Sequence, residues 1–331
     1  MMRIDPTLRA LADPTRLRIM RLLAAMELAV GELAQVLGQS QPRVSRHVRI
    51  LCDARLAERR KEGSWVFLRS AVGPGRAPPL GAAAAQLLAV AESDDAPFAA
   101  QCSEDRRHLA AIRAAREASA AAYFARHAAE WDELRGLHSP DAPVEAALNY
   151  ALGTGSLGAL LDVGTGTGRI AQLLAPRASQ ITALDNSPEM LRLARARLQH
   201  LAAEHLALVQ GDFTALPFAE AAFDTVLFHQ VLHYAQAPEL VLAEAARVTR
   251  PGGTIAVVDF AAHDREELRS QHAHARLGFS DEQMLSLLAS AGFAAAPPTA
   301  LPGTPLTVKI WTGQRGSTVS QPSPAAKAAA A

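Results

Sequence analysis

Apolar residues recur with helical spacing through the first 70 residues, and short breaks separate the runs. Asp13 followed by Pro14 marks the start of one helix, because Asp is a good N-cap and Pro fits the first helical turn. A further helical run over residues 30–37 is closed by Gly38, and Ser40 caps the next helix. The pattern predicts a compact helical domain.

A β-hairpin is expected after these helices. Residues 56–61 and 65–68 are suited to strands, and they flank Glu62-Gly63-Ser64, which is suited to a turn. The stretch 73–79 is rich in Gly and Pro and indicates a linker or a loop. Two helical patterns follow, over about 80–92 and 104–136.

From about residue 144, short apolar runs alternate with amphipathic helical segments. Such alternation is typical of a doubly wound α/β sheet, in which helices cover both faces of parallel strands. The predicted strands are 159–163, 180–185, 206–210, 225–228, 253–259 and 306–311. The tail from Gly313 is rich in Gly, Ser, Pro and Ala, and we expect it to be disordered.

Composition narrows the class of protein. Hydrophobic residues make up 49% of the 331 residues and charged residues 20%, as in globular chains with a real core. The chain has no apolar run of about 18 residues and no apolar N-terminal signal, so we expect a cytoplasmic protein without a membrane partner. Cys52 and Cys102 are too few for a disulfide framework, and no metal site is expected.

The net charge of zero hides an uneven distribution. Residues 1–72 contain 13 Lys and Arg against 7 Asp and Glu, an excess of six positive charges that the rest of the chain balances. This excess favours a polyanionic partner for the first block. A solvated basic face is the alternative, and charge alone does not decide between the two.

The helix that begins near Ser40 carries side chains suited to reading DNA. In a helix-turn-helix, the N-terminal residues of the second helix face base edges in the major groove. Arg can grip guanine and Gln can grip adenine through paired hydrogen bonds, and a basic hairpin would lie along phosphates. The candidate DNA-binding residues are Gln41, Arg43, Ser45, Arg46, His47, Arg60 and Lys61.

Three segments in order, Leu11–Ile19, Glu32–Ala34 and Ser40–His47, resemble ArsR-type winged-helix repressors. The resemblance covers about residues 1–70. It implies a homodimer that binds an inverted repeat of double-stranded DNA and is released by a ligand. Many members of the family sense metals through thiolates near the helix that precedes the recognition helix. Met26–Gly31 contains neither Cys nor His, so metal sensing at that place is not expected.

The run Leu160–Gly168 reads as a strand that ends in a glycine-rich turn. Glycines suit such a turn because a cofactor must approach the backbone closely. Asp185 follows 21 residues after Gly164, where a carboxylate can accept from both ribose hydroxyls. A dinucleotide is the alternative ligand. However, Asp162 would repel a pyrophosphate and attract an ammonium group, which favours S-adenosylmethionine or S-adenosylhomocysteine.

Residues 120–312 resemble class I S-adenosylmethionine-dependent methyltransferases, through this turn and through Phe223–Val226, Val231–Tyr234 and Arg247–Gly253. The resemblance implies contacts to the aminoacyl end from the turn, to the ribose from Asp185 and to the adenine from Asp212. A cap or turn role is the alternative for both carboxylates. The implied cofactor-binding residues are Asp162, Gly164, Thr165, Gly166, Gly168, Asp185, Asn186, Met190, Asp212, Phe213 and His229.

The predicted fold is α/β, with an N-terminal winged helix-turn-helix domain followed by a doubly wound, Rossmann-like methyltransferase domain. The predicted segments are the winged helix 1–72, a linker and helical region for dimerisation or cofactor cover 73–136, the methyltransferase-like domain 137–312 and the tail 313–331.

Two functions are compatible with this organisation. In the first, the methyltransferase-like domain is the sensor of a transcriptional repressor, and the resemblance implies control of methionine-cycle genes. In the second, the chain is an active small-molecule methyltransferase that carries a DNA-binding domain. His229 and His233 are weak candidates for a catalytic base, and many methyltransferases need none because alignment of the reactants suffices.

Overall fold

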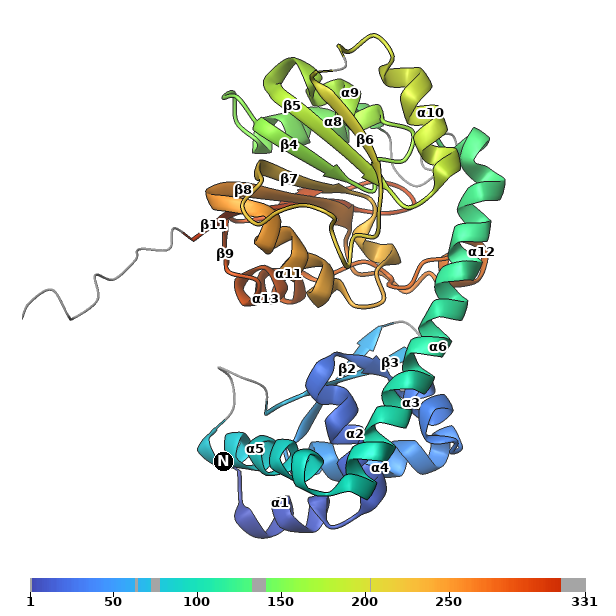
Figure 1. Ribbon diagram of the computed structural model, residues 1–331, viewed down its shortest axis with the longest axis vertical. Helices are drawn as coiled ribbons and strands as arrows, with labels where there is room; N and C mark the ends of the chain where they lie inside the picture. Colours follow the sequence, from blue (N-terminus) through green and yellow to red (C-terminus); the bar gives the residue numbers. More distant parts are fainter. Residues whose placement is uncertain (1, 63–64, 73–77, 133–140, 203, 317–331) are drawn as a thin grey trace, which may run out of the picture. The chain divides into compact units, whose positions relative to one another are not determined.

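The computed structural model describes residues 2–62, 65–72, 78–132, 141–202 and 204–316 (Figure 1). The chain forms two compact units. Unit 1 consists of Met1–Phe124, Tyr234–Ala237 and Ala262–Gly278, and unit 2 consists of Ala125–His233, Pro238–Ala261 and Phe279–Ala331. Within the described ranges, no helix is both long enough and apolar enough to cross a bilayer.

Unit 1 combines helices with a small antiparallel sheet. Its helices are α1 (Ile4–Leu11), α2 (Pro14–Ala25), α3 (Val30–Leu37), α4 (Gln41–Asp53), α5 (Pro79–Asp94), α12 (Glu267–His272) and α6 (Ala96–His127), which continues into unit 2. In the sheet, β3 (Trp65–Ser70) lies between β1 (Leu28–Ala29) and β2 (Ala57–Glu62). The predicted hairpin and the predicted helices up to α5 are confirmed. The helix expected over about 104–136 instead begins at Ala96 and ends at His127, and residues 133–136 of that range lie outside the described residues.

The expected helix boundaries have visible causes. The Asp13 carboxylate accepts a hydrogen bond from the Arg16 backbone N–H at 3.0 Å and so caps α2. Gly38 adopts a left-handed φ of 63° at the end of α3. Ser40 occupies the N-cap position of α4, although its side chain makes no capping hydrogen bond.

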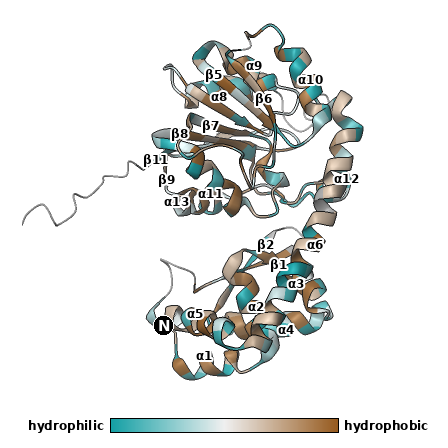
Figure 2. Cartoon of the chain, in the orientation of Figure 1, coloured by the Kyte–Doolittle hydropathy of each residue, from teal (hydrophilic) through white to brown (hydrophobic). Residues whose placement is uncertain are grey.

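The core of unit 1 is formed by the apolar faces of α2, α3, α4 and the hairpin, which Figure 2 shows in brown. Ile19, Leu33 and Leu68 are fully buried there. Leu88 of α5 and Leu109 of α6 belong to the same core. The helical region expected over 73–136 therefore packs with the N-terminal elements as far as Phe124.

Unit 2 is built on a mixed sheet. In the described part of the chain it has eight strands, in the order β10-β11-β8-β7-β4-β5-β6, and β9 pairs with β11. The strands are β4 (Gly158–Val163), β5 (Ala178–Asp185), β6 (Leu206–Gln210), β7 (Phe223–His229), β8 (Thr249–Phe260), β9 (Phe293–Ala295), β10 (Thr299–Leu301) and β11 (Val308–Arg315). Strands β4 to β8 are parallel, whereas β9, β10 and β11 pair antiparallel.

Helices lie on both sides of this sheet (Figure 1), as in a Rossmann-like fold. The helical elements are η1 (Ala128–Glu130), α8 (Asp141–Ala151), α9 (Arg169–Leu174), η2 (Ala175–Arg177), α10 (Pro188–Leu198), η3 (Leu232–Tyr234), α11 (Pro238–Val248) and α13 (Asp281–Ser290). The chain runs from β4 outward to β6 and then returns to the other side of β4 as β7. In such sheets the carboxyl ends of the strands at this reversal form the ligand crevice.

The predicted tail begins too early. β11 continues to Arg315, where Gly313 pairs with Ile255 and Gln314 with Thr254. The Gly- and Ser-rich composition did not predict this end of the strand, because Gly313 pairs through its backbone and adds no apolar side chain to the pattern. The linker residues 73–77 and the tail residues 317–331 lie outside the described residues. Strands β9 and β10 and helix α8 had no counterpart among the predicted elements.

Candidate functional site

The glycine-rich turn follows β4, the strand at which the sheet order reverses. Gly164, Gly166 and Gly168 have φ angles of 68°, 55° and 80°, a region that other residues rarely adopt. A Cβ on Gly164 would lie 2.3 Å from Cγ2 of Val231, which follows β7. Any side chain at position 164 would therefore displace its neighbour.

The third glycine serves the packing of two helices. A Cβ on Gly168 would lie 3.2 Å from the Cα of Ala194 in α10 and 3.0 Å from Leu198. Among the described residues, a Cβ at Gly166 would meet the indole of Trp131 alone, at 3.6 Å. Gly168 thus holds α9 close to α10, while Gly166 lies under the ring of Trp131.

Asp185 lies at the end of β5, beside the turn. Its two carboxylate oxygens accept hydrogen bonds from the backbone N–H groups of Gly166, at 2.8 Å, and Ser187, at 2.9 Å. Burial raises the pKa of this carboxyl above its usual range, although hydrogen bonds from the backbone of Ser187, Gly166 and Asn186 oppose the shift. A half-buried carboxyl group therefore lies beside the glycine-rich turn, as the spacing predicts.

Asp162 and Thr165 are also adjacent. Asp162 is 1% exposed, and one of its carboxylate oxygens accepts a hydrogen bond from the Thr165 hydroxyl at 2.6 Å. Met190 is buried at the start of α10, whereas Asn186 is exposed just before that helix. Asp162 thus lies at the end of β4 and Thr165 just after it, while Asn186 and Met190 follow β5.

Asp212 follows β6 and is exposed, and its carboxylate accepts hydrogen bonds from the backbone N–H and the hydroxyl of Thr214, both at 2.7 Å. Phe213 beside it is half-buried. In this structure Asp212 stabilises a turn, which was the alternative reading of this residue.

Two predicted histidines lie near the carboxyl ends of β7 and β8, and both are buried. His229 ends β7. The Nδ1 atom of His233 lies 2.7 Å from the Asp259 carboxylate, which also accepts from the His233 backbone N–H at 3.1 Å. Asp259 was not predicted as a site residue, because a single carboxylate within a long apolar strand belongs to no spacing motif.

A polar cluster near the glycine-rich turn was also missed. The Asp132 carboxylate accepts from the Thr167 hydroxyl at 2.8 Å and pairs with Arg197 of α10. Arg197 also donates to the Thr167 hydroxyl at 2.7 Å. Asp132 and Trp131 thus tie the segment that precedes the sheet to the glycine-rich turn. This placement is compatible with the cofactor cover expected of the helical region 73–136.

The predicted reading helix in unit 1 is amphipathic. Gln41, Arg43, Ser45 and Arg46 of α4 are exposed. The buried residues, Val44, Val48 and Leu51, lie one helical turn apart on the opposite face. His47 is partly buried, and its Nδ1 lies 3.6 Å from the Asp13 carboxylate. The basic face of α4 is therefore open to a partner, but His47 turns toward the start of α2.

The hairpin arginine lies differently from the expectation. Lys61 is exposed, as a phosphate contact requires. Arg60 instead pairs with Glu27 at 3.1 Å, and its guanidinium lies 5.0 Å from the ring centroid of Phe67. Among the described residues, no group of three or more His, Cys, Asp and Glu side chains is arranged to hold a metal ion.

Comparison with known families now decides the class of each part. Residues 13–59 match the family model described as "Bacterial regulatory protein, arsR family", and residues 161–257 match the model described as "Methyltransferase domain". The chain joins an ArsR-family domain to a methyltransferase domain. The methyltransferase match covers the glycine-rich turn, Asp185 and Asp212, and the ArsR match covers α2 to α4.

Curated relatives of the methyltransferase domain include two malonyl-[acyl-carrier protein] O-methyltransferases. The Serratia marcescens protein is 40% identical over 33% of this chain and 41% of its own length. The Herminiimonas arsenicoxydans protein is 33% identical over 51% of this chain and 64% of its own length. A demethylmenaquinone methyltransferase of Renibacterium salmoninarum is 38% identical over 30% of this chain and 40% of its own length. The chain therefore spans less than two thirds of these relatives.

Solved structures with a similar chain trace include a 1,6-didemethyltoxoflavin-N1-methyltransferase of Burkholderia thailandensis, crystallised with its namesake substrate and S-adenosylhomocysteine. It is 22% identical, covers 61% of this chain and 89% of its own, and has a TM-score of 0.47. An S-adenosylmethionine-dependent methyltransferase of Aquifex aeolicus is 17% identical, covers 55% and 97%, and has a TM-score of 0.44.

Proposed function

We propose that this protein is a DNA-binding transcriptional repressor whose methyltransferase domain binds S-adenosylmethionine or S-adenosylhomocysteine as an effector. One observation carries the proposal: a single chain holds both a reading helix with an open basic face and a glycine-rich turn that is hydrogen-bonded to the half-buried carboxyl group of Asp185. The genes of the methionine cycle are the natural targets of such a sensor.

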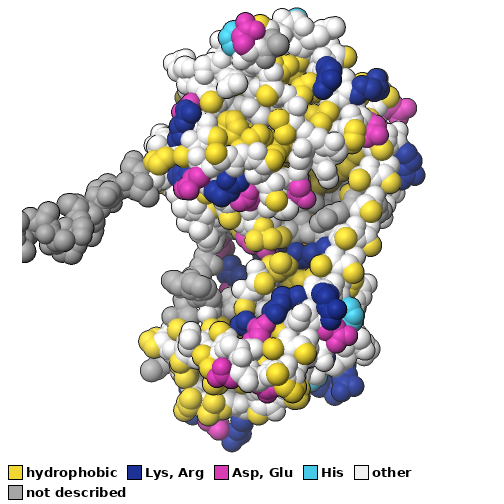
Figure 3. Space-filling model, in the orientation of Figure 1, with side chains coloured by type: hydrophobic (Ala, Val, Ile, Leu, Met, Phe, Trp, Pro, Cys, Tyr) yellow, Lys and Arg dark blue, Asp and Glu magenta, His cyan; other side chains and the backbone are white. Residues whose placement is uncertain are grey.

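The reading helix supports sequence-specific binding to double-stranded DNA. Arg43 and Arg46 are exposed near the N-terminal end of α4, where a helix-turn-helix contacts base edges. An inverted-repeat operator requires two such helices, and unit 1 offers an apolar surface for a second copy of the chain. Figure 3 shows hydrophobic side chains over α1 and α5, and the exposed ones there are Ile4, Leu8, Leu87 and Val90.

The residues of the turn fit a nucleoside that ends in an amino acid. Asp185 lies at the end of the strand after the turn, and its carboxylate suits the two ribose hydroxyls. Gly166 lets that ligand approach the backbone, because its left-handed φ excludes most side chains. Asp162 favours an ammonium group over the pyrophosphate of a dinucleotide. In this proposal Phe213 and Asp212 contact the adenine, and His229 lies near the sulfur end.

Methyl transfer is the second candidate function, and the names of the curated relatives favour it. The His233–Asp259 pair near the carboxyl ends of β7 and β8 would orient an imidazole near an acceptor. In this reading the ArsR-family domain would regulate the gene of the enzyme itself.

The test combines three measurements on the full chain. A fluorescein-labelled duplex is first selected by the wild-type protein from a random pool, and its affinity is measured by anisotropy with and without each nucleoside. Calorimetry then gives the affinity for S-adenosylmethionine, S-adenosylhomocysteine and NAD⁺. Finally, radiolabelled S-adenosylmethionine is incubated with cell extract to detect methyl transfer.

We expect one of the two S-adenosyl ligands to change the DNA affinity by about 5- to 150-fold, the usual range of allosteric coupling. NAD⁺ should give no heat. If neither ligand changes DNA affinity while the extract becomes labelled, the chain is an enzyme and the sensor proposal is wrong. The absence of heat with both ligands would remove both candidate functions.

A further inference from the structure

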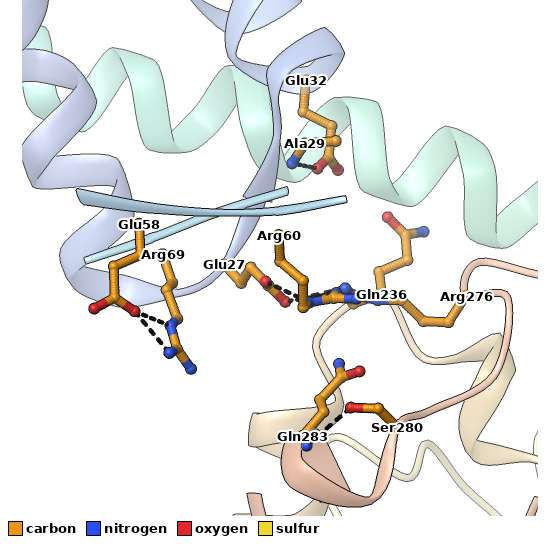
Figure 4. Close-up of polar contacts among 10 residues, drawn as sticks. All are labelled: Glu27, Ala29, Glu32, Glu58, Arg60, Arg69, Gln236, Arg276, Ser280 and Gln283. Carbon is orange, nitrogen blue, oxygen red and sulfur yellow. Dashed lines mark hydrogen bonds and ion pairs between the residues drawn. The ribbon is translucent and has the colours of Figure 1, made fainter. Parts of the chain in front are cut away.

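One carboxylate in unit 1 is shared by two arginines from distant parts of the chain (Figure 4). Glu27 precedes β1, and its Oε1 atom lies 3.1 Å from Nε of Arg60 in the hairpin strand β2. Its Oε2 atom accepts from Nη2 of Arg60 at 3.2 Å and from Nη1 of Arg276 at 3.1 Å. Arg276 lies 249 residues from Glu27 along the chain.

The surroundings of Arg276 make this contact specific. Arg276 is only 1% exposed, and its guanidinium lies 4.2 Å from the ring centroid of Phe67 in β3. It also donates to the backbone carbonyl of Gln236 at 2.7 Å. Burying an arginine to this extent costs desolvation free energy, and removing Arg276 leaves Glu27 with one positive partner instead of two. The position is therefore sensitive to any movement of the segment that carries it.

Arg276 belongs to a segment that follows the residues matched by the methyltransferase model and packs within unit 1. This segment, Ala262–Gly278, begins two residues after the end of β8. A second segment that packs within unit 1, Tyr234–Ala237, follows His233 directly and contains Gln236. Both are covalently continuous with strands whose carboxyl ends form the edge at which the ligand is proposed to bind. That edge therefore has a covalent path to Gln236, three residues after His233, and a longer one to Arg276, sixteen residues after Phe260.

We propose that Glu27 is the switch through which the effector controls the DNA-binding hairpin, with Arg60 and Arg276 competing for its charge. This inference rests on the function proposed above. While Arg276 is docked, it shares the charge of Glu27, so Glu27 holds Arg60 less firmly than it would alone and Arg60 can exchange this contact for a phosphate. When the effector withdraws Arg276, Glu27 holds Arg60 alone, and the protein loses a DNA contact.

The simpler reading is that the three side chains only fasten the segment to the hairpin. The two readings differ in the effect of removing either partner. If the three side chains only attach the segment, substitutions of Glu27 and of Arg276 change DNA affinity in the same direction, since both loosen the same contact. If the two arginines compete for Glu27, the substitutions change DNA affinity in opposite directions, because Glu27 restrains Arg60 and Arg276 relieves that restraint.

The experiment measures affinity for the selected duplex, with and without the effector, in E27Q, R276A and the double variant. R276A should bind DNA about tenfold more weakly than wild type without effector, the worth of one charge-assisted hydrogen bond, and should respond little to the effector. E27Q should keep tight binding when the effector is added. The double variant should behave as E27Q does, because Arg60 then has no Glu27 carboxylate to hold it.

Matched controls come from the same segments. Arg265 lies in the segment of Arg276 but pairs with Glu267 beside it, so R265A should respond to the effector as wild type does. Glu58 pairs with Arg69 across the hairpin, and E58Q removes the same charge as E27Q (Figure 4). E58Q should preserve the response. Circular dichroism and calorimetry with the effector establish that each variant is folded and binds it.

Two results overturn the proposal, and they differ. If the wild type responds to the effector and both E27Q and R276A respond equally, the switch is wrong while the sensor function stands. The same conclusion follows if both variants shift DNA affinity in one direction. If the wild type itself shows no response, the sensor function fails, and the switch fails with it. Should R276A not fold, E27Q against E58Q still decides the matter.

Discussion

The two candidate binding regions of this protein are built in different ways. On α4, the residues that would read DNA are exposed side chains, and the fold depends on their buried neighbours Val44 and Val48. At the glycine-rich turn, the backbone itself forms the site, and Asp185 is hydrogen-bonded to it. Function and stability are therefore separable on α4 and inseparable at the turn.

This difference has a direct consequence for mutagenesis. Exposed positions away from caps and partners change stability little, so losses on α4 report binding alone. A left-handed glycine in van der Waals contact with a neighbouring segment reports both properties at once. A variant at either region therefore needs a control substitution that isolates binding from stability.

The largest effect is expected for Gly164→Ala. Ala pays about 1–2 kcal/mol in the left-handed region, and its Cβ would overlap Val231, which adds about 1–3 kcal/mol of overpacking. We therefore expect a loss of about 2–5 kcal/mol in the free energy of unfolding of the methyltransferase domain. Denaturant unfolding followed by circular dichroism measures this loss.

Gly153→Ala is the matched control for that substitution. Gly153 has a φ of 66°, close to that of Gly164, but in the described part of the chain nothing lies within 4 Å of its Cβ position. G153A should lose only the conformational part, about 1–2 kcal/mol. Equal losses in the two variants would show that the contact with Val231 contributes nothing.

A smaller effect is expected for Asp185→Asn on ligand affinity. The carboxylate would accept from ribose hydroxyls, and hydrogen bonds to a charged group are worth about 1.5–3 kcal/mol, so calorimetry should show a loss of about 10- to 100-fold. Asp224→Asn removes a carboxylate from the start of β7, at the opposite edge of the sheet, and should leave affinity unchanged. Wild-type affinity in D185N would exclude Asp185 as the ribose partner.

How far the sequence predicts each region follows from the same contrast. The glycine spacing and Asp185 were predictable, because a turn after a parallel strand constrains residues that are close in the chain. The exposed face of α4 was predictable for the same reason, since helical periodicity is local. Both families are confirmed by the matches over 13–59 and 161–257.

The features that the sequence did not predict depend on contacts between distant residues. Asp259 meets His233 across 26 positions, and Arg276 meets Glu27 across 249. No spacing rule connects such pairs, because tertiary folding decides them. For the same reason the sequence predicts that Arg60 contacts a DNA phosphate, whereas in the structure Arg60 pairs with Glu27. The grouping of Ala262–Gly278 with unit 1 was equally hidden, since composition does not change there.

On α4, Arg46→Ala should weaken binding to the selected duplex by about 1–3 kcal/mol if Arg46 reads a base. The control is Arg49→Ala, one turn further along α4, where Arg49 is 77% exposed and lies 4.0 Å from Asp53. R49A should weaken binding less and equally for all sequences. Both variants should unfold at the wild-type denaturant concentration. A lower midpoint for R46A would contradict the separation of binding from stability on this helix.

The smallest effect is the dependence of ligand affinity on pH. Burial raises the pKa of Asp185 in the ligand-free protein, and ribose hydroxyls would donate to the ionised form. As the pH falls through this raised pKa, the carboxyl is protonated and becomes a poorer acceptor, so affinity falls, by at most about tenfold per pH unit for one proton. Calorimetry at several pH values measures the slope, and D185N should flatten it. A slope of the same size in D185N would show that another group takes up the proton. The glycine-rich turn would then differ from α4 in its backbone conformation and not through the charge of Asp185.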